Sequence, residues 1–481
     1  MTDETHRRRW LAVYVICVAD LMIVLDSTIV NVALPSIRSD LGFSEASLAW
    51  VVNAYLLTFG GFLLLAGRFG DLFGQRRLFL IGIAEFTVAS LLCGLASSEA
   101  FLVAARAVQG IGGAIVSAIA LSLVMILFTE TGERAKAMGI IGFVLSGGGT
   151  AGVLLGGTLT DLLSWHWIFL VNIPVGIAAF VLCRVLIPAD QPAQRGSIDV
   201  AGAVTVTASL MLAVYAIVNG NDKGWTSAQT LGLLAAAAGL MVSFVFIESR
   251  AKAPLMPLGI WRIRNVTSAN VTGMLLAGAM FAWFFLSALY LQRVLGYSAL
   301  EVGLAFLPGT LVWGAASLFL SSMLVIRFGI KPPLLAGLAC YLVALLLFAR
   351  APVDGSYWVD VFPAMLILGI GGGITFNPIL MAAMSGVAPT EAGLASGVVN
   401  TSFMMGGALG LAILASAAAS RTESLSASGH GDLAALTGGY HLAFAIGAAF
   451  AVLAGVVAAT LIRAEPATAP HAAEGMPAPA D

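Results

Sequence analysis

The chain has 481 residues, of which 59% are hydrophobic and only 10% are charged, and its formal net charge is −2. Soluble globular domains carry about 25% charged residues, so this composition excludes an ordinary soluble protein. The near-neutral charge and the lack of a basic block argue against a nucleic-acid partner. The four cysteines stand alone in apolar runs, with neither a disulfide framework nor metal-ligand spacing.

Apolar stretches long enough to cross a bilayer as a helix, which takes about 20 residues, recur along the whole chain. The first follows Arg7–Arg9 and is expected to stay uncleaved, because it is too long for a signal peptide and lacks an Ala-x-Ala site. The fourteen spans are expected at residues 11–34, 47–66, 78–97, 101–124, 137–159, 168–187, 199–218, 229–248, 266–290, 302–325, 333–350, 359–382, 394–418 and 440–462.

Breaks in the apolar pattern divide these spans into groups of six, two and six. Most of the 23 Lys and Arg residues fall in alternate connections, on the side of both termini, so the positive-inside rule places both termini of this multi-pass protein in the cytoplasm. The sequence predicts an all-α fold with a six-helix bundle at 1–190, a linker with two additional helices at 191–264, a second six-helix bundle at 265–463 and a disordered tail at 464–481.

An acid and a base inside the spans are the first candidate site. Asp26 lies in the first span and Arg106 in the fourth, at comparable depth, so that the two charges are expected to pair and offset the cost of leaving water. Gln109 shares the helix face of Arg106. A buried carboxylate beside an arginine suits proton coupling, because a conformational change that alters either burial or pairing changes its proton occupancy. The alternative is a purely structural ion pair.

Two further acids inside the spans are weaker candidates for proton coupling. Asp20 lies six residues before Asp26, about 240° around the helix, so the two carboxylates are not expected to point into one cavity. Glu85 lies in the third span. Its alternative interpretation is a structural contact with the backbone or with an arginine at the membrane surface.

Glycines at a spacing of four residues mark the fifth span. Gly148, Gly152 and Gly156 fall on one helix face, with Gly157 beside them, and small residues at this spacing let two helices approach closely. The spacing alone does not separate static packing from gating.

A short basic turn follows the second span. It contains Gly67, Asp71, Gly74, Arg76 and Arg77, and its glycines permit a tight reversal of the chain. The stretch Arg327–Lys331 follows the second span of the later half and repeats part of this pattern, with Gly329 in the place of Gly74. This echo favours two related halves, an architecture known from transporters.

Aromatic and sparse polar residues in several spans are the candidate substrate contacts. Such a lining suits large amphipathic molecules better than sugars, which need many hydrogen bonds. The candidates are Trp50, Tyr55, Phe281, Phe284 and Tyr290 among the aromatic residues, and Asn31, Asn53, Gln109, Asn270, Asn377 and Asn400 among the polar ones.

Several of these motifs together resemble those of the major facilitator superfamily. The turn Gly67-x-x-x-Asp71-x-x-Gly74-x-Arg76-Arg77 resembles its signature loop, and Arg106-x-x-Gln109-Gly110 its fourth-helix motif. The stretch from Leu25 to Pro35 is similar to the first-helix motif of the fourteen-span drug:proton antiporters, and the match extends to about residue 410. Two positions depart from the pattern, because Val153 stands where the family usually has proline and His166 where it has arginine.

The resemblance implies a rocker-switch exporter of the cytoplasmic (inner) membrane that uses proton uptake to expel amphipathic drugs or antibiotics by alternating access. Asp26 and Arg106 would be its coupling and binding centre, and the glycine-rich fifth helix its gate, although Val153 removes the kink that proline supplies. The alternative is proton-coupled uptake or export of a dedicated metabolite. No nucleotide-binding motif and no buried set of His or Cys ligands supports a pump or a membrane enzyme. We expect no cofactor, a monomer, and partners limited to the substrate, protons and lipid.

Overall fold

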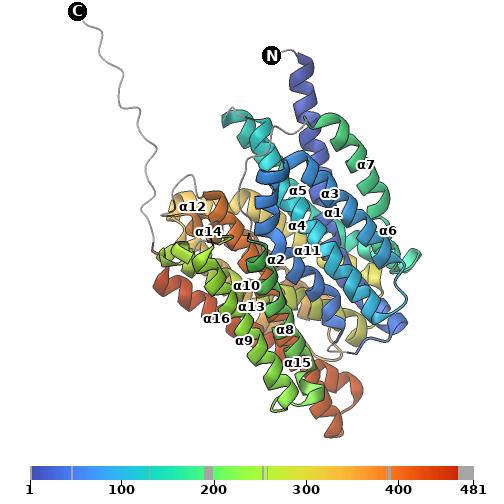
Figure 1. The fold of residues 1–481 in the computed structure, drawn as a ribbon. Coiled ribbons are helices and arrows are strands. Elements are labelled where there is room, and N and C mark those ends of the chain that lie inside the picture. Colours follow the sequence, from blue (N-terminus) through green and yellow to red (C-terminus); the bar gives the residue numbers. More distant parts are fainter. Residues whose placement is uncertain are drawn as a thin grey trace, which may run out of the picture.

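The computed structural model describes residues 3–44, 47–128, 131–188, 199–251, 254–256, 258–385, 387 and 392–463. These residues form a bundle of long helices and no strand (Figure 1). Helices are the expected solution for a chain in lipid, because each helix satisfies its own backbone hydrogen bonds where water is absent. The predicted tail at 464–481 and most of the break at 189–199 lie outside the described residues.

The helices alternate in direction through the bundle. We call the side on which α1 begins the near side and the opposite side the far side. The first group is α1 (Asp3–Leu41), α2 (Trp50–Phe73), α3 (Gln75–Gly94), α4 (Glu99–Leu127), α5 (Thr131–Leu162), α6 (Trp167–Leu170) and α7 (Asn172–Leu186). A hairpin of α8 (Val200–Lys223) and α9 (Ala228–Arg250) follows.

The second group is built in the same way, with several short irregular segments. It comprises α10 (Arg264–Leu289), α11 (Ala299–Ala315), α12 (Ser322–Phe328), α13 (Lys331–Phe348), α14 (Phe362–Met384), α15 (Ala392–Ala427) and α16 (Asp432–Leu461). Two 3₁₀ turns lie at Ser47–Ala49 (η1) and Leu258–Arg262 (η2), and π-helical segments lie at Tyr290–Val294 (η3), Ala316–Ser321 (η4) and Tyr357–Val361 (η5).

The predicted all-α membrane fold is confirmed. Thirteen helices within the described residues are long and apolar enough to cross a membrane, and α5, with 32 residues, is the fourteenth helix of the predicted set. The predicted turn echo is also present, since Gly74 and Gly329 have φ values of 99° and 79°, which glycine adopts readily. The boundaries proposed between the bundles stay predictions. The connection between α15 and α16 is shorter than expected, because both helices continue beyond the apolar core.

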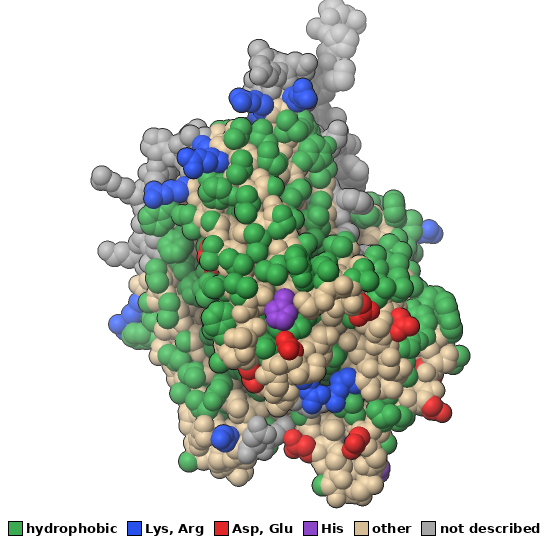
Figure 2. Space-filling view, turned by 90° about the vertical axis from the view of Figure 1, so that its right-hand side faces the viewer, with side chains coloured by type: hydrophobic (Ala, Val, Ile, Leu, Met, Phe, Trp, Pro, Cys, Tyr) green, Lys and Arg blue, Asp and Glu red, His purple; other side chains and the backbone are tan. Residues whose placement is uncertain are grey.

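The surface agrees with a protein surrounded by lipid. Apolar side chains cover the middle of the face in Figure 2, and Lys and Arg side chains lie above and below them, with several at the top, toward the near side. Many large apolar side chains are exposed, such as Val242 at 69% and Ile326 at 79%. A soluble protein rarely exposes so continuous an apolar surface.

The hairpin α8–α9 packs where the two groups meet. Helix α8 contacts α2 of the first group and α15 of the second, and α2 also contacts α15. Gly61 of α2 faces Thr207 of α8, and Gly60 faces Met404 of α15. The additional helices therefore lie against the seam between the halves.

Glycines bring α10 and α15 into backbone contact. A Cβ atom on Gly410 would collide with the Cα atom of Gly278, and one on Gly406 with the backbone of Met274. Backbone cannot move away as a flexible side chain does. Close approach at this interface therefore requires glycine.

We predict that Gly410→Ala destabilises the protein by about 1–3 kcal/mol, the usual cost of overpacking, and lowers the midpoint of thermal unfolding in detergent. The matched control is Gly239→Ala in α9, where an added Cβ meets nothing within 4 Å. Equal midpoints for the two variants would contradict the close α10–α15 packing.

Candidate functional site

A buried ion pair between α1 and α4 is the centre of the candidate site. The Nη1 atom of Arg106 lies 2.5 Å from Oδ2 of Asp26, and both side chains are 0% exposed. The Nε atom of Arg106 also donates to the backbone carbonyl oxygen of Val51 in α2, at 3.0 Å. The structure thus brings together the two charges that the sequence placed at comparable depth, and ties α1, α2 and α4 to one guanidinium.

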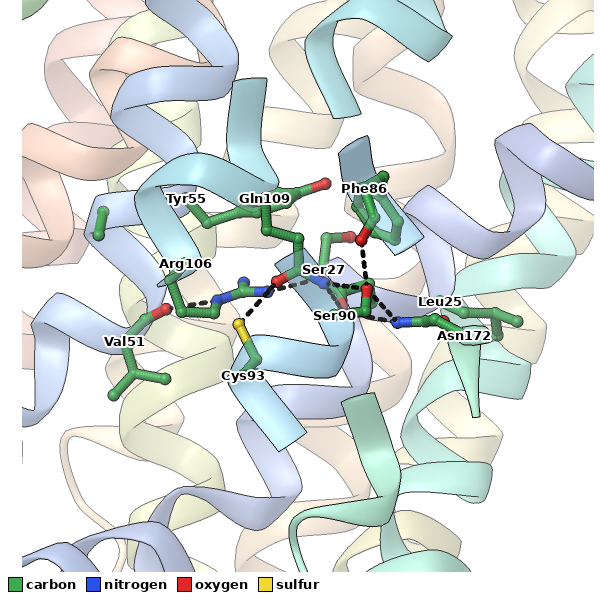
Figure 3. A network of polar contacts seen from close by, with 12 residues as sticks. Leu25, Ser27, Val51, Tyr55, Phe86, Ser90, Cys93, Arg106, Gln109 and Asn172 are labelled. Carbon is green, nitrogen blue, oxygen red and sulfur yellow. Dashed lines mark hydrogen bonds and ion pairs between the residues drawn. The ribbon is translucent and has the colours of Figure 1, made fainter. Parts of the chain in front are cut away.

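Amide and hydroxyl groups complete a polar network around this pair (Figure 3). Gln109 donates through Nε2 to Oδ1 of Asp26 and to Oγ of Ser90, each at 2.8 Å, and accepts from Arg106 through Oε1 at 2.5 Å. Asn172 of α7 donates to the same Oδ1 atom of Asp26 at 3.0 Å. Both carboxylate oxygens of Asp26 therefore accept hydrogen bonds, from donors on α4 and α7.

Sequence reasoning missed Ser90 and Asn172 as members of this network. Asn172 is 3% exposed and Ser90 is 0% exposed. Asn172 had a usable signal, because it is an amide at the beginning of an apolar run, whereas a serine within a span carries little information. Gln109 was found because it lies one turn from Arg106.

Aromatic rings close the site around the guanidinium. The Cζ atom of Arg106 lies 4.3 Å from the centre of the Tyr55 ring and 5.6 Å from that of Phe169. A desolvated cation over an aromatic face gains about 2 kcal/mol. The Nη2 atom of Arg106 and the hydroxyl of Tyr55 are buried without a hydrogen-bond partner in the described structure. Each of these two groups therefore keeps the capacity for one further hydrogen bond.

The other two candidate acids lie outside this network. Asp20 accepts a hydrogen bond from Oγ of Ser117 in α4, at 3.0 Å. Both carboxylate oxygens of Glu85 are buried without a hydrogen-bond partner in the described structure, and an added Cβ on Gly112 would collide with one of them. Glu85 therefore faces α4, and among the described residues its carboxylate forms a hydrogen bond neither with the backbone nor with an arginine, the two contacts of its structural alternative.

The candidate substrate contacts fall into groups with different surroundings. Asn53 is fully buried, and neither polar atom of its side chain has a partner in the described residues. Phe284 stacks on Phe306 with ring centres 5.7 Å apart, and Phe281 contacts Phe403. Trp50 packs against Tyr215 of the added hairpin, with ring centres 6.4 Å apart.

Most of the other candidate substrate contacts form hydrogen bonds within the protein. Asn31 and Asn270 donate to carbonyl oxygens of their own helices. Tyr290 donates to the carbonyl oxygen of Pro352 at 2.7 Å, at the far end of α10. Asn377 donates to Ser321 in η4 at 3.3 Å, and Asn400, in α15, is half-buried.

The glycines of α5 face two different partners. Gly148 packs on Val24 of α1, Gly152 on Thr28 and Leu25, and Gly156 on the carbonyl of Ile29. Gly157 instead packs on the backbone of Ala299 and Leu300 in α11, which belongs to the other half. Gly148, Gly152 and Gly156 therefore join α5 to α1, and Gly157 joins the two halves.

The basic turn lies on the near side between α2 and α3. Gly74 ends α2 with its positive φ value, and Arg76 donates to the carbonyl oxygen of Arg184 at the end of α7. An added Cβ on Gly67 would meet nothing within 4 Å. Arg77 is exposed, and the side chain of Asp71 lies outside the described residues.

A bundle of membrane-spanning helices with a hydrogen-bonded ion pair buried inside it is the architecture of a secondary transporter. The family model of the Major Facilitator Superfamily matches residues 16–411, and the chain belongs to this superfamily. The resemblance deduced from the loop, first-helix and fourth-helix motifs is therefore confirmed.

Similar proteins are resistance and export proteins. The puromycin resistance protein pur8 of Streptomyces alboniger is 38% identical over 465 residues, which are 95% of this chain and 92% of that protein. The cephamycin export protein CmcT of Amycolatopsis lactamdurans is 40% identical over 417 residues, 86% of this chain and 85% of that protein. These relatives confirm the predicted drug-exporter branch.

Solved structures share the fold at low identity. A peptide transporter of the POT family superposes with a TM-score of 0.67 at 15% identity, covering 96% of this chain and 99% of that one. A mutant of the nucleoside transporter NupG superposes with a TM-score of 0.65 at 12% identity, covering 94% and 100%. The predicted facilitator fold, two six-helix bundles with two additional helices, is confirmed.

We predict that Arg106→Met lowers the free energy of unfolding by about 3–5 kcal/mol, because it leaves the carboxylate of Asp26 buried without its counter-ion. The double variant Asp26→Asn/Arg106→Met removes both charges and should recover a large part of this loss. Thermal unfolding of the purified proteins in detergent measures both. A double variant less stable than Arg106→Met would show that the two charges do not depend on one another.

Proposed function

We propose that this protein exports amphipathic antibiotics or drugs across the cytoplasmic membrane in exchange for protons, with both termini in the cytoplasm. The observation that carries the proposal is the fully buried Asp26–Arg106 pair, in which both carboxylate oxygens accept hydrogen bonds. The names of the similar proteins support an antibiotic or drug as substrate. The aromatic groups around Phe284 support an amphipathic one.

Proton coupling follows from competition between the proton and the substrate. The ionised carboxylate of Asp26 holds Arg106 in place, and the Nη2 atom of Arg106, which has no hydrogen-bond partner among the described residues, is the donor to which a polar group of the substrate binds. A proton on Asp26 removes the charge that holds Arg106, so this donor changes position and the substrate leaves. Loss of the proton restores the ion pair, and the next substrate binds.

Contacts between the halves on the far side support alternating access. The carboxylate of Asp161, at the end of α5, accepts from the backbone N–H groups of Ala299 and Leu300 at 3.2 and 2.8 Å. Gln292 donates to the carbonyl oxygen of Val32 in α1 at 2.8 Å. We assign these far-side contacts to a state that is closed toward the outside. In this state the substrate enters from the near side.

We predict that Asp26→Asn abolishes transport driven by a pH gradient while the protein still inserts in the membrane. Asparagine keeps the shape and an acceptor but binds no proton, so the exchange cycle loses its coupling step. The measurement is uptake of fluorescent dyes and antibiotics into inverted vesicles with an imposed proton gradient.

The control for this experiment is Asp360→Asn, which alters a carboxylate that caps the beginning of η5 in the second group. It should transport like the wild type. Efflux by Asp26→Asn equal to the wild type would overturn the coupling role. Gradient-driven transport confined to one metabolite would instead support the dedicated-metabolite alternative.

We predict that Asp161→Ala opens the far-side contact between α5 and α11. Hydrogen bonds to a charged group contribute about 1.5–3 kcal/mol, enough to shift a balanced equilibrium between two states by tenfold or more. Spin labels at Leu162 and Leu304 should show an added population at longer distance by double electron–electron resonance. The control is Asp40→Ala, which removes a far-side contact within the first group, to Trp165. Identical distance distributions for the wild type and Asp161→Ala would contradict the closing role.

A further inference from the structure

Two buried carboxyl groups meet at the near end of the α8–α9 hairpin, away from the Asp26–Arg106 pair. Asp199 immediately precedes α8 and is 7% exposed, and Glu248 lies in the last turn of α9 and is 3% exposed. In each carboxyl group, one oxygen accepts a hydrogen bond from a backbone N–H group. Oδ1 of Asp199 accepts from the N–H of Gly202 at 2.7 Å, and Oε2 of Glu248 accepts from that of Met256 at 3.3 Å.

Their remaining oxygens face the same small space. A Cβ atom on Gly202 would lie 2.5 Å from Oδ2 of Asp199 and 2.9 Å from Oε1 of Glu248. Both of these oxygens are buried, and neither has a hydrogen-bond partner among the described residues. The absence of a side chain at Gly202 leaves the room in which the two carboxyl groups meet.

Two carboxylates that share a buried site cannot both stay ionised, because each charge opposes the other and neither is solvated. One proton between the free oxygens removes this conflict and supplies the missing hydrogen bond. We propose that Asp199 and Glu248 share one proton, forming a second proton-binding site that joins the near ends of α8 and α9 beside α2.

The surroundings of the pair are apolar on the side of α2. Leu65 of α2 packs with Ala203 and Leu255 beside the pair, and Phe62 and Phe69 pack against them. Of the charged groups on the adjoining elements, Arg68 is exposed, and Arg250 lies over the ring of Phe246 at 4.3 Å.

Asp190, Arg195 and Lys252, which are near the pair in sequence, and the side chain of Asp71 in the last turn of α2 lie outside the described residues. The test therefore includes variants of Arg195 and Lys252. A cation bridged by the two carboxylates is a further outcome that the test separates from a shared proton.

The site links proton concentration to the seam between the halves. Helix α8 contacts both α2 and α15, so a change at its near end acts on the helix that packs against the seam. While the proton is present, the near ends of α8 and α9 are held together. Its loss at high pH leaves two like charges facing each other, and the stability that the pair contributes falls as pH rises.

The experiment measures the midpoint of thermal unfolding of the purified full-length protein in detergent from pH 5 to pH 9. It compares the wild type with Glu248→Gln, whose amide donates to Asp199 as the shared proton does, at every pH. We expect equal midpoints at pH 5 and a wild-type midpoint several degrees lower than that of the variant at pH 9. Asp199→Asn keeps a good helix cap and serves as the second variant if Glu248→Gln fails to fold.

Three results would overturn the proposal. The first is a difference between wild type and variant that does not change with pH. The second is loss of the pH dependence in Lys252→Met or Arg195→Met, which would assign a salt bridge. The third is stabilisation of the wild type, but not of Glu248→Gln, by sodium, potassium or magnesium chloride at pH 8, which would assign a cation. Because unfolding is measured without substrate or gradient, none of these results depends on the proposed transport function.

Discussion

A guanidinium buried among helices in lipid is the constraint on which the rest of this structure depends. Arg106 is fully buried, and its charge is tolerable only because Asp26, Gln109 and the carbonyl oxygen of Val51 surround it. Breaking such a pair is strongly unfavourable, since it leaves one charge without compensation. Under the proposed function, protonation of Asp26 would therefore change the position that Arg106 can hold. The proposed exchange of a proton against a substrate rests on this requirement.

The glycines allow close contacts between helices without large side chains between them, and the proposed exchange needs helices that move relative to each other. Gly148, Gly152 and Gly156 place α5 directly on α1, the helix that carries Asp26. Gly157 and the carboxylate of Asp161 place the same helix on α11 of the other half. In the proposed cycle, a change in the protonation of Asp26 would therefore act on α1, and α5, which packs on α1, also forms a contact between the halves.

The sequence predicted the ion pair and the helical fold because both leave strong signals. A charged residue in an apolar run is conspicuous, and long apolar runs identify membrane helices. Ser90 and Asn172 were missed, because small polar groups are common in spans and only the folded arrangement shows that they converge on Asp26 and Gln109. The π-helical segment at Ala316–Ser321 was also not predicted, since a one-residue shift in backbone pairing has no compositional signal. The sequence did not predict that the carboxyl groups of Asp199 and Glu248 face each other, because each lies at the end of a span, where acids are ordinary.

The central claim is that Asp26 exchanges its proton for the substrate, and proton release on substrate binding tests it most directly. Purified protein in weakly buffered detergent solution is mixed with a transported antibiotic at a series of pH values, and the released protons are counted with a pH indicator. The account predicts that release by the wild type rises toward about one proton per bound substrate as the pH is lowered, and that Asp26→Asn releases none. Binding of the substrate by the wild type with no change in bound protons at any pH would contradict it.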